Sequence, residues 1–280
     1  MTTSPGVLPN FLIIGAAKCA TTSIYHQLSQ HPDVCVPGGS MAEKEPAFFS
    51  QQNAGTWDNG LDWYKSLFQH WDGEKAVGEA STSYTKTPAY SDPPELIQQV
   101  IPDARLIYII RNPLDQILSH YRHIVLYGDA DATFAHSIFE GDFLISVASY
   151  YRQIQAYMSR FEREQLLVIL FEDYVRATHE YGVRLCEFLE IDATIPLEGE
   201  PRNVSRSKRY EKVRGAHRFI AKAPRGIARL ASELLTRPVS SIRWTPETHA
   251  YAAEQLAPDI AALRDFLGDD LDRWNLSYRG

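Results

Sequence analysis

Short apolar runs alternate with segments of helical periodicity along the first two thirds of the chain. The runs are bounded by polar or turn-forming residues, which is typical of buried strands in a parallel sheet. They predict strands at about 10–14, 34–36, 76–79, 105–110 and 166–171. The patterns between them predict helices at about 20–30, 93–101, 113–127, 142–162 and 174–190. Strands that alternate with helices indicate an α/β domain whose central sheet is mostly parallel.

Two predicted helices begin at recognisable capping residues. Asn112 precedes Pro113 and Thr245 precedes Pro246, so each pair joins a good N-cap to a proline suited to the first helical position. The second pair predicts an amphipathic helix near 246–267. Beyond residue 200 we expect helices and no clear strand. Without a repeat or a linker, the pattern predicts a single domain over 1–280, with a core at about 10–195 and a basic, helical portion at about 200–280.

The composition fits a globular protein of the cytoplasm. The chain has 280 residues, 44% of them hydrophobic, which suffices for one sizeable core. Its first residues lack the basic and apolar regions of a signal peptide. No apolar run approaches the roughly 20 residues that cross a bilayer. The three cysteines show neither metal nor redox spacing, so we expect reduced thiols and a cytoplasmic location.

The charge is unevenly distributed along the chain. The net charge of −7 argues against general nucleic-acid binding. Residues 202–243 nevertheless hold twelve Lys and Arg against two Glu, a local charge of +10. Such a segment suggests an anionic ligand or surface, including peripheral contact with a membrane. The alternative is a solvated basic face on a helix that packs against the core.

An anion site is predicted where the first strand meets the first helix. The apolar run from Phe11 ends at Gly15, Lys18 follows, and a helical pattern begins after three hydroxyl residues. Backbone N–H groups at a helix start, together with the helix dipole, favour negative charge. The lysine adds a cation, so the bound group is most simply a phosphate or a sulfate. The expected contacts are Gly15, Ala17, Lys18, Cys19, Ala20, Thr21, Thr22 and Ser23.

A second anion contact is predicted after the strand at 105–110. Arg111 ends this strand and a helix starts at once, which places the arginine at the carboxyl edge of the sheet. Ser119 lies about two helical turns further along and is expected to face the same edge. Taken alone, Arg111 is better interpreted as a helix-capping or ion-paired arginine. Beside the first loop, a second anion contact is the better interpretation.

These segments resemble those of sulfotransferases that use 3′-phosphoadenosine 5′-phosphosulfate (PAPS), of the bacterial type. The loop at 15–23 is similar to their 5′-phosphosulfate loop, and Arg111-Asn-Pro with Ser119 and Tyr121 is similar to their 3′-phosphate-binding strand and helix. Three further stretches agree, namely His31-Pro-Asp-Val, Glu79-Ala-Ser-Thr-Ser-Tyr84 and residues 167–174. The resemblance covers about residues 10–210, and a weaker similarity extends to Trp274. It rests on the shared order and spacing of these motifs.

The resemblance implies a P-loop-like three-layer α/β fold and a sulfuryl transfer from PAPS that needs no metal. Lys18 would stabilise the leaving phosphate, and Arg111 and Ser119 would hold the 3′-phosphate, the arginine bidentately. In relatives a late basic loop closes over that phosphate. The candidates for this loop are Arg206, Lys208 and Arg209, and the sequence does not choose among them.

Glu45 is the expected general base. Lys44-Glu45-Pro-Ala-Phe-Phe49 resembles the Lys-Glu-Pro-His-Phe-Phe stretch of the heparan-sulfate branch, where the glutamate has this role. Ala80 and Ser50 replace a lysine and an acidic residue of that branch, so the chain is expected to share its base without its polysaccharide contacts. Cys19, beside a lysine and a helix start, has either a lowered pKa or the plain role of a small residue in a tight loop.

Two other functions remain open from the sequence. A nucleotide kinase of the P-loop type would need a Gly-Lys-Ser/Thr ending, which the first loop lacks. A non-catalytic nucleotide-binding protein would keep the anion contacts without Glu45 acting as a base. For the enzyme, the acceptor is expected to be a hydroxyl, or less readily an amine, of a small molecule, a carbohydrate or a lipid. The sequence does not identify it.

Overall fold

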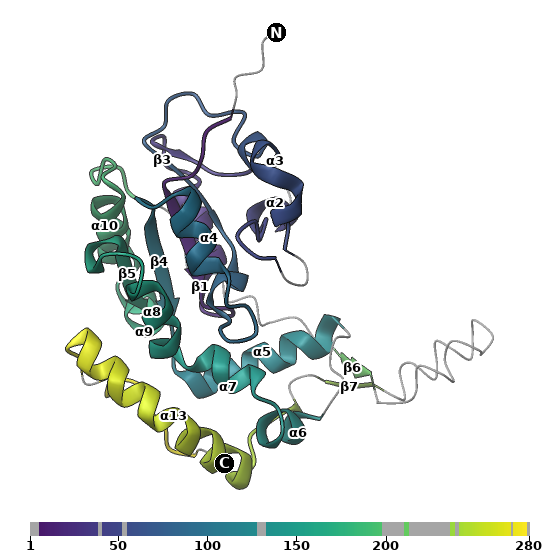
Figure 1. Cartoon of the computed structure of the whole chain (residues 1–280). Helices are drawn as coiled ribbons and strands as arrows, with labels where there is room; N and C mark the ends of the chain where they lie inside the picture. Colours follow the sequence, from purple (N-terminus) through teal and green to yellow (C-terminus); the bar gives the residue numbers. More distant parts are fainter. Residues whose placement is uncertain are drawn as a thin grey trace.

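A five-stranded parallel sheet organises the chain (Figure 1). The computed structural model describes residues 6–38, 41–51, 55–127, 133–197, 210–212, 236–238, 241–269 and 271–278. Its sheet has the strand order β2-β3-β1-β4-β5, with every pairing parallel. The strands are β1 (Phe11–Gly15), β2 (Val34–Cys35), β3 (Ala76–Ala80), β4 (Arg105–Ile110) and β5 (Leu166–Leu170). All five predicted strands and the predicted α/β class are therefore confirmed.

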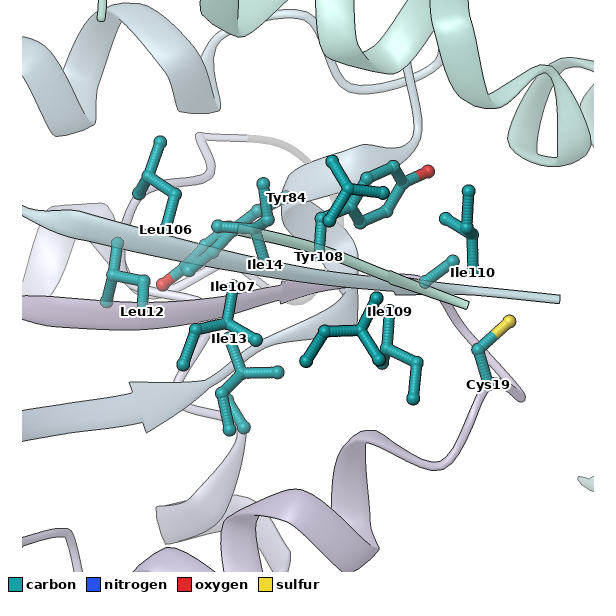
Figure 2. Close-up of a cluster of buried hydrophobic side chains, with 14 of the residues drawn as sticks. Leu12, Ile13, Ile14, Cys19, Tyr84, Leu106, Ile107, Tyr108, Ile109 and Ile110 are labelled. Carbon is teal, nitrogen blue, oxygen red and sulfur yellow. The ribbon is translucent and has the colours of Figure 1, made fainter. Parts of the chain in front are cut away.

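The strands are apolar because both faces of the sheet are covered. All residues of β1, β3 and β5 are buried. Ile107 and Ile109 of β4 point to one side of the sheet, while Leu106, Tyr108 and Ile110 point to the other (Figure 2). Alternate side chains thus enter two apolar layers, and the sheet is the middle layer of a three-layer fold.

The predicted helices occur in the predicted order, and two of them are interrupted. The first half of the chain has α1 (Thr21–Leu28), α2 (Met41–Lys44), α3 (Gly60–Ser66), α4 (Pro93–Val100) and α5 (Pro113–Tyr127). After α5 come α6 (Phe134–Phe139), α7 (Phe143–Ala148), α8 (Tyr150–Met158), α9 (Phe171–Arg176), α10 (Thr178–Leu189) and α13 (Pro246–Leu267). Single-turn 3₁₀ helices are η1 (Trp57–Asn59), η2 (Thr82–Thr85) and η3 (Arg163–Gln165). The helix predicted at 174–190 starts earlier and breaks at Ala177.

A side chain from the C-terminal helix explains the break in the helix predicted at 142–162. The backbone leaves the helical conformation at Ser149, and α8 then starts afresh. The carboxylate of Asp259 on α13 accepts hydrogen bonds from the amides of Tyr151 and Arg152, at 3.0 and 2.8 Å. It satisfies donors that open a helix and would otherwise lack partners. Since this cap lies over a hundred residues away in the chain, no local pattern indicates it.

The expectation that no strand follows residue 200 was wrong. Tyr210–Lys212 forms β6 and Thr236–Pro238 forms β7, and the two pair antiparallel. Each strand is three residues long and mixes polar with apolar side chains, so neither shows the alternation that marks a strand. The predicted helix α13 is confirmed, with Thr245 capping the amide of Thr248. It packs against α8 (Figure 1).

None of the helices within the described ranges combines the length and the apolar composition needed to cross a membrane.

We predict that Gly78→Ala destabilises the sheet. A Cβ at Gly78 would lie 2.5 Å from both the ring and the carbonyl oxygen of Phe11 on the paired strand. Backbone cannot move aside cheaply in a close-packed sheet, so we expect a loss of about 1–3 kcal/mol in the free energy of unfolding. Urea denaturation measures it. Gly38→Ala is the matched control, because its Cβ meets nothing within 4 Å. Equal midpoints for the two variants would contradict the prediction.

Candidate anion and catalytic site

The loop between β1 and α1 has the backbone of an anion cradle. Gly15, Lys18 and Ala20 have positive φ, of 151°, 67° and 71°. A Cβ at Gly15 would lie 2.1 Å from Oγ1 of Thr85, so only glycine fits there. Left-handed conformations are uncommon for lysine and alanine, and they persist where the surroundings hold them. Alternation of left- and right-handed residues turns successive N–H groups toward one concavity that suits an anion.

Helix α1 opens toward the same concavity. Its N-cap is Ala20, whose side chain makes no capping hydrogen bond. Amides at a helix start and the positive end of the helix dipole attract an anion. Thr21 and Ser23 are buried at the first turn, and Thr22 is half-buried. Ala17 is buried too, and its carbonyl oxygen accepts a hydrogen bond from Nε2 of Gln116 at 3.1 Å. The predicted loop residues are thus assembled around one backbone turn.

The alternative of a lowered pKa for Cys19 was wrong. Its side chain is fully buried at the margin of the apolar cluster (Figure 2), with Sγ 3.9 Å from the hydroxyl of Tyr150. Burial raises the pKa of the thiol to about 12, although Arg111 and Tyr150 act in the opposite direction. The thiol packs beneath the loop and does not face the helix start. Cys19 is therefore a small residue that fills the loop interior.

Arg111 meets this loop from the end of β4. Its NH1 donates to the carbonyl oxygen of Lys18 at 3.4 Å, and its NH2 pairs with Asp115 at 3.3 Å. The guanidinium lies 5.1 Å from the ring centroid of Phe171. Its Nε is buried and has no hydrogen-bond partner among the described residues. The structure thus joins the two predicted anion contacts. Ser119 is half-exposed on α5, four residues after Asp115 and so on the same helix face.

A clamp that the sequence did not predict holds the chain beside Arg111. The carboxylate of Glu172 accepts from the amide of Asn112 at 2.9 Å and from Nε1 of Trp274 at 2.8 Å. Asn112 caps α5 as predicted, because its Oδ1 accepts from the amide of Leu114 at 3.0 Å. Its Nδ2 donates to the carbonyl oxygen of Asn275 at 3.1 Å. An acidic residue directly after a buried strand was the available signal for this clamp.

Lys18 contacts one histidine of α5, and Lys18 and Lys86 both act electrostatically on a second. Nζ of Lys18 lies 3.3 Å from Nδ1 of His123 on α5. The pKa of the neighbouring His120 is lowered to about 3, mainly by burial, with smaller contributions in the same direction from Lys86, His123 and Lys18. His120 is therefore neutral and a poor proton acceptor near pH 7. His120 is therefore a buried packing group.

Glu45 lies beyond α2 and is tied to the carboxyl end of β3. Its Oε1 accepts from Nζ of the buried Lys44 at 2.8 Å, and its Oε2 accepts from the hydroxyl of Thr82 at 3.1 Å. Burial lowers the pKa of Lys86, and the charge of Glu45 opposes that shift. Lys86 thus interacts with both Glu45 and His120, and His120 also senses Lys18. The candidate base and the anion cradle therefore lie at the same edge of the sheet.

Arg206, Lys208 and Arg209 lie outside the described residues. Their contact with a nucleotide stays a prediction.

The comparisons with known proteins agree on one family. The family model described as "Sulfotransferase domain" matches residues 8–247. A solved sulfotransferase from Alicyclobacillus acidocaldarius is 27% identical, with a TM-score of 0.70 over 96% of this chain and 99% of that one. A mouse sulfotransferase, SULT7A1, solved in complex with PAP, shares the fold at 14% identity and a TM-score of 0.50, over 94% of this chain and 90% of that one.

Curated relatives match over shorter stretches. Human bifunctional heparan sulfate N-deacetylase/N-sulfotransferase 2 is 35% identical over 44% of this chain and 14% of its own length. The membrane-associated sulfotransferase kil1 of Dictyostelium discoideum is 32% identical over 41% of this chain and 22% of its length. Mouse heparan sulfate glucosamine 3-O-sulfotransferase 6 is 33% identical over 40% of this chain and 30% of its length. The matched stretches are therefore a minor part of each relative.

We predict that the folded protein resists alkylation at pH 8. Burial raises the pKa of Cys19 to about 12 and those of Cys35 and Cys186 to about 11, so reactive thiolate is scarce. Iodoacetamide followed by mass spectrometry should leave the three thiols unmodified over a time in which urea-unfolded protein reacts fully. Rapid labelling of Cys19 in the folded protein would restore the alternative of an activated thiol.

Proposed function

The chain belongs to the sulfotransferase family, and on that premise we propose that it moves a sulfuryl group from PAPS to a hydroxyl of a small-molecule, carbohydrate or lipid acceptor. One observation carries this proposal. Arg111 reaches the carbonyl oxygen of Lys18, so two anion contacts from different strands form one continuous surface. PAPS has negatively charged groups at both ends of its ribose, and such a ligand needs two joined contacts.

The residues present fit the donor. The Nε of Arg111, which has no partner among the described residues, and the helix start at Ala20, which lacks a capping side chain, are donors that a doubly anionic ligand would satisfy. Thr21, Thr22, Ser23 and the loop amides would hold the 5′ end. Arg111 and Ser119 would hold the 3′-phosphate. The PAP complex of the mouse protein with this fold supports the same choice of ligand.

Lys18 and Glu45 would share the chemistry. The donor supplies an activated sulfuryl group and a phosphate that leaves with negative charge. Lys18, held near α5 by His123, would stabilise that charge, because a preorganised cation in a partly dry site acts strongly. Glu45 would take the proton of the acceptor hydroxyl. Lys44 and Thr82 fix its two oxygens and so orient it.

The acceptor class rests on the relatives and on the aromatic surroundings of Glu45. Two curated relatives are named for sulfation of heparan or its glucosamine, which supports a sugar. Trp57 and Trp63 pack on Phe48, next to the loop of Glu45, and suit sugars and other ring-shaped acceptors alike. An amine acceptor is the second choice. The cytoplasmic location and the membrane contact of 202–243 stay predictions.

We predict that the protein binds 3′-phosphoadenosine 5′-phosphate without magnesium and in preference to ATP. Isothermal titration calorimetry measures both affinities. Arg111→Ala should weaken the bisphosphate about 10- to 100-fold, the scale of charge-assisted hydrogen bonds to a phosphate. Arg111→Lys keeps the charge and should recover only part of the loss, since lysine cannot bind bidentately. Preference for ATP, or binding only with magnesium, would instead favour a nucleotide kinase.

We predict that Glu45→Gln abolishes most transfer and leaves nucleotide binding unchanged. Glutamine keeps the shape but removes the base, so we expect kcat to fall about 10²- to 10⁴-fold. The assay is release of the bisphosphate from PAPS in the presence of a panel of phenols, sugars and lipids. Glu43→Gln is the matched control, since Glu43 is an exposed carboxylate two residues away. Unchanged transfer in Glu45→Gln would remove Glu45 from the mechanism. A nucleotide-binding protein without turnover would be inactive before the substitution.

A further inference from the structure

A buried carboxyl group lies beneath the loop that carries Glu45. Glu79 of β3 is fully buried, and the hydroxyls of Tyr84 and Tyr64 donate to its Oε1 at 2.6 and 3.2 Å. Its Oε2 has no hydrogen-bond partner among the described residues. Burying a carboxyl group is costly, and such groups are expected to have a structural or functional reason. The proposed chemistry does not use Glu79 directly.

Two hydroxyl groups beside Glu79 hold the backbone of that loop. The Tyr84 hydroxyl accepts from the amide of Phe49 at 3.3 Å. The Ser81 hydroxyl accepts from the amide of Ala47 at 2.9 Å, and Ser81 also interacts with both Glu79 and Tyr84. The Tyr84 hydroxyl donates its hydrogen bond to Glu79, so its oxygen lone pairs are available to accept from the amide of Phe49. Hydrogen bonds in such a chain strengthen one another.

The loop that carries Glu45 has a backbone conformation that it would not keep by itself. Ala47 has φ of 51°, in the left-handed region that disfavours alanine. A non-glycine residue persists there where its surroundings over-determine it. Ala47 is fixed on both sides, since its amide donates to Ser81 and its carbonyl oxygen accepts from the amide of Thr56 at 3.3 Å. Glu45 is two residues away, so its position depends on this fixed turn.

We propose that Glu79 is a positioning residue for Glu45, acting through the hydroxyls of Tyr84 and Ser81 on the backbone at 47–49. The inference rests on the proposed function only in giving Glu45 its role as the base. The physical link between Glu79 and the loop exists in the ligand-free protein, so it is tested without any substrate.

The surroundings of Glu79 make this link sensitive to pH. The pKa of Glu79 is raised to about 7, mainly by burial. The charge of Glu45 contributes to the rise, while hydrogen bonds from Tyr84, Ser81 and Tyr64 oppose it. The other groups that sense its charge are Tyr25 on α1 and Tyr157 on α8, both with pKa values raised by burial. Opening the loop would hydrate Glu79 and lower its pKa. Ionisation above pH 7 therefore favours opening, and protonation below pH 7 favours the closed loop.

The first test compares two tyrosines that contact the same carboxylate oxygen. Tyr84→Phe removes a hydroxyl that bonds both Glu79 and Phe49, whereas Tyr64→Phe removes one that bonds Glu79. Hydrogen exchange of the ligand-free protein, read by mass spectrometry, gives protection factors for 44–50 and for β4 as a reference for global opening. We expect Tyr84→Phe to lower protection of 44–50 about tenfold, the scale of a buried hydrogen bond, with β4 unchanged. Tyr64→Phe should change 44–50 less than twofold.

The second test uses pH. Protection of 44–50, corrected for intrinsic exchange, should fall about tenfold in the wild type between pH 6 and pH 8. In Glu79→Gln, which is neutral throughout, it should stay flat while β4 behaves as in the wild type. Equal effects of the two tyrosine variants on 44–50, or the same pH dependence in Glu79→Gln and wild type, would overturn the proposal.

Failure of the proposed function is visible separately. It would show as absent binding of 3′-phosphoadenosine 5′-phosphate to the wild type, whatever the exchange data give. If that binding is present, Tyr84→Phe should retain it within twofold, because the variant leaves the β1–α1 loop and Arg111 unchanged.

Discussion

The parallel pairing of β1 with β3 on one side and β4 on the other determines where every candidate residue can lie. Parallel strands end at the same edge, so the segments that follow the three strands meet there. After β1 comes the loop of Lys18, after β4 comes Arg111, and after β3 comes Thr82, which binds Glu45. The chain runs from β1 toward β2 first and toward β4 later, so β1 and β4 flank the point where the order reverses. Crevices at such points are where open α/β sheets bind ligands.

The low dielectric of the partly buried surroundings strengthens the electrostatic interactions at this edge of the sheet. Lys18, Lys86 and His123 act electrostatically on His120, which stays neutral, and Glu45 acts electrostatically on Lys86. Cationic groups held in a partly dry place attract an anion more strongly than the same groups in water. An anion that binds the folded protein at these groups would link the stability of the protein to occupancy of the site.

Much of this arrangement could be predicted from local patterns, and the remainder depends on contacts between distant segments. The five strands, the cap at Asn112 and the capped start of α13 are encoded within a few residues of where they occur. The cap of α8 by Asp259 and the clamp of Asn112 by Glu172 join residues that lie 60 or more positions apart. For Cys19, the neighbouring charges were visible in the sequence, but the direction of its side chain was not. Burial outweighs the charges, so the pKa of the thiol is raised and the alternative of a lowered pKa fails. Glu79 could be placed on its strand, whereas its tyrosine partners come from α3 and η2.

The order in which the protein is synthesised affects when the clamp formed by Glu172, Trp274 and Asn275 can be completed. Synthesis proceeds from the N-terminus, so the strand that ends at Arg111 emerges from the ribosome long before Trp274 and Asn275. The nascent chain can pair β1 with β4 early, yet Glu172 and Asn112 gain their last hydrogen-bond partners only when residues 274 and 275 arrive. The final shape around Arg111 is therefore a late event in biogenesis. Nascent chains stalled before that point would lack both of these hydrogen bonds.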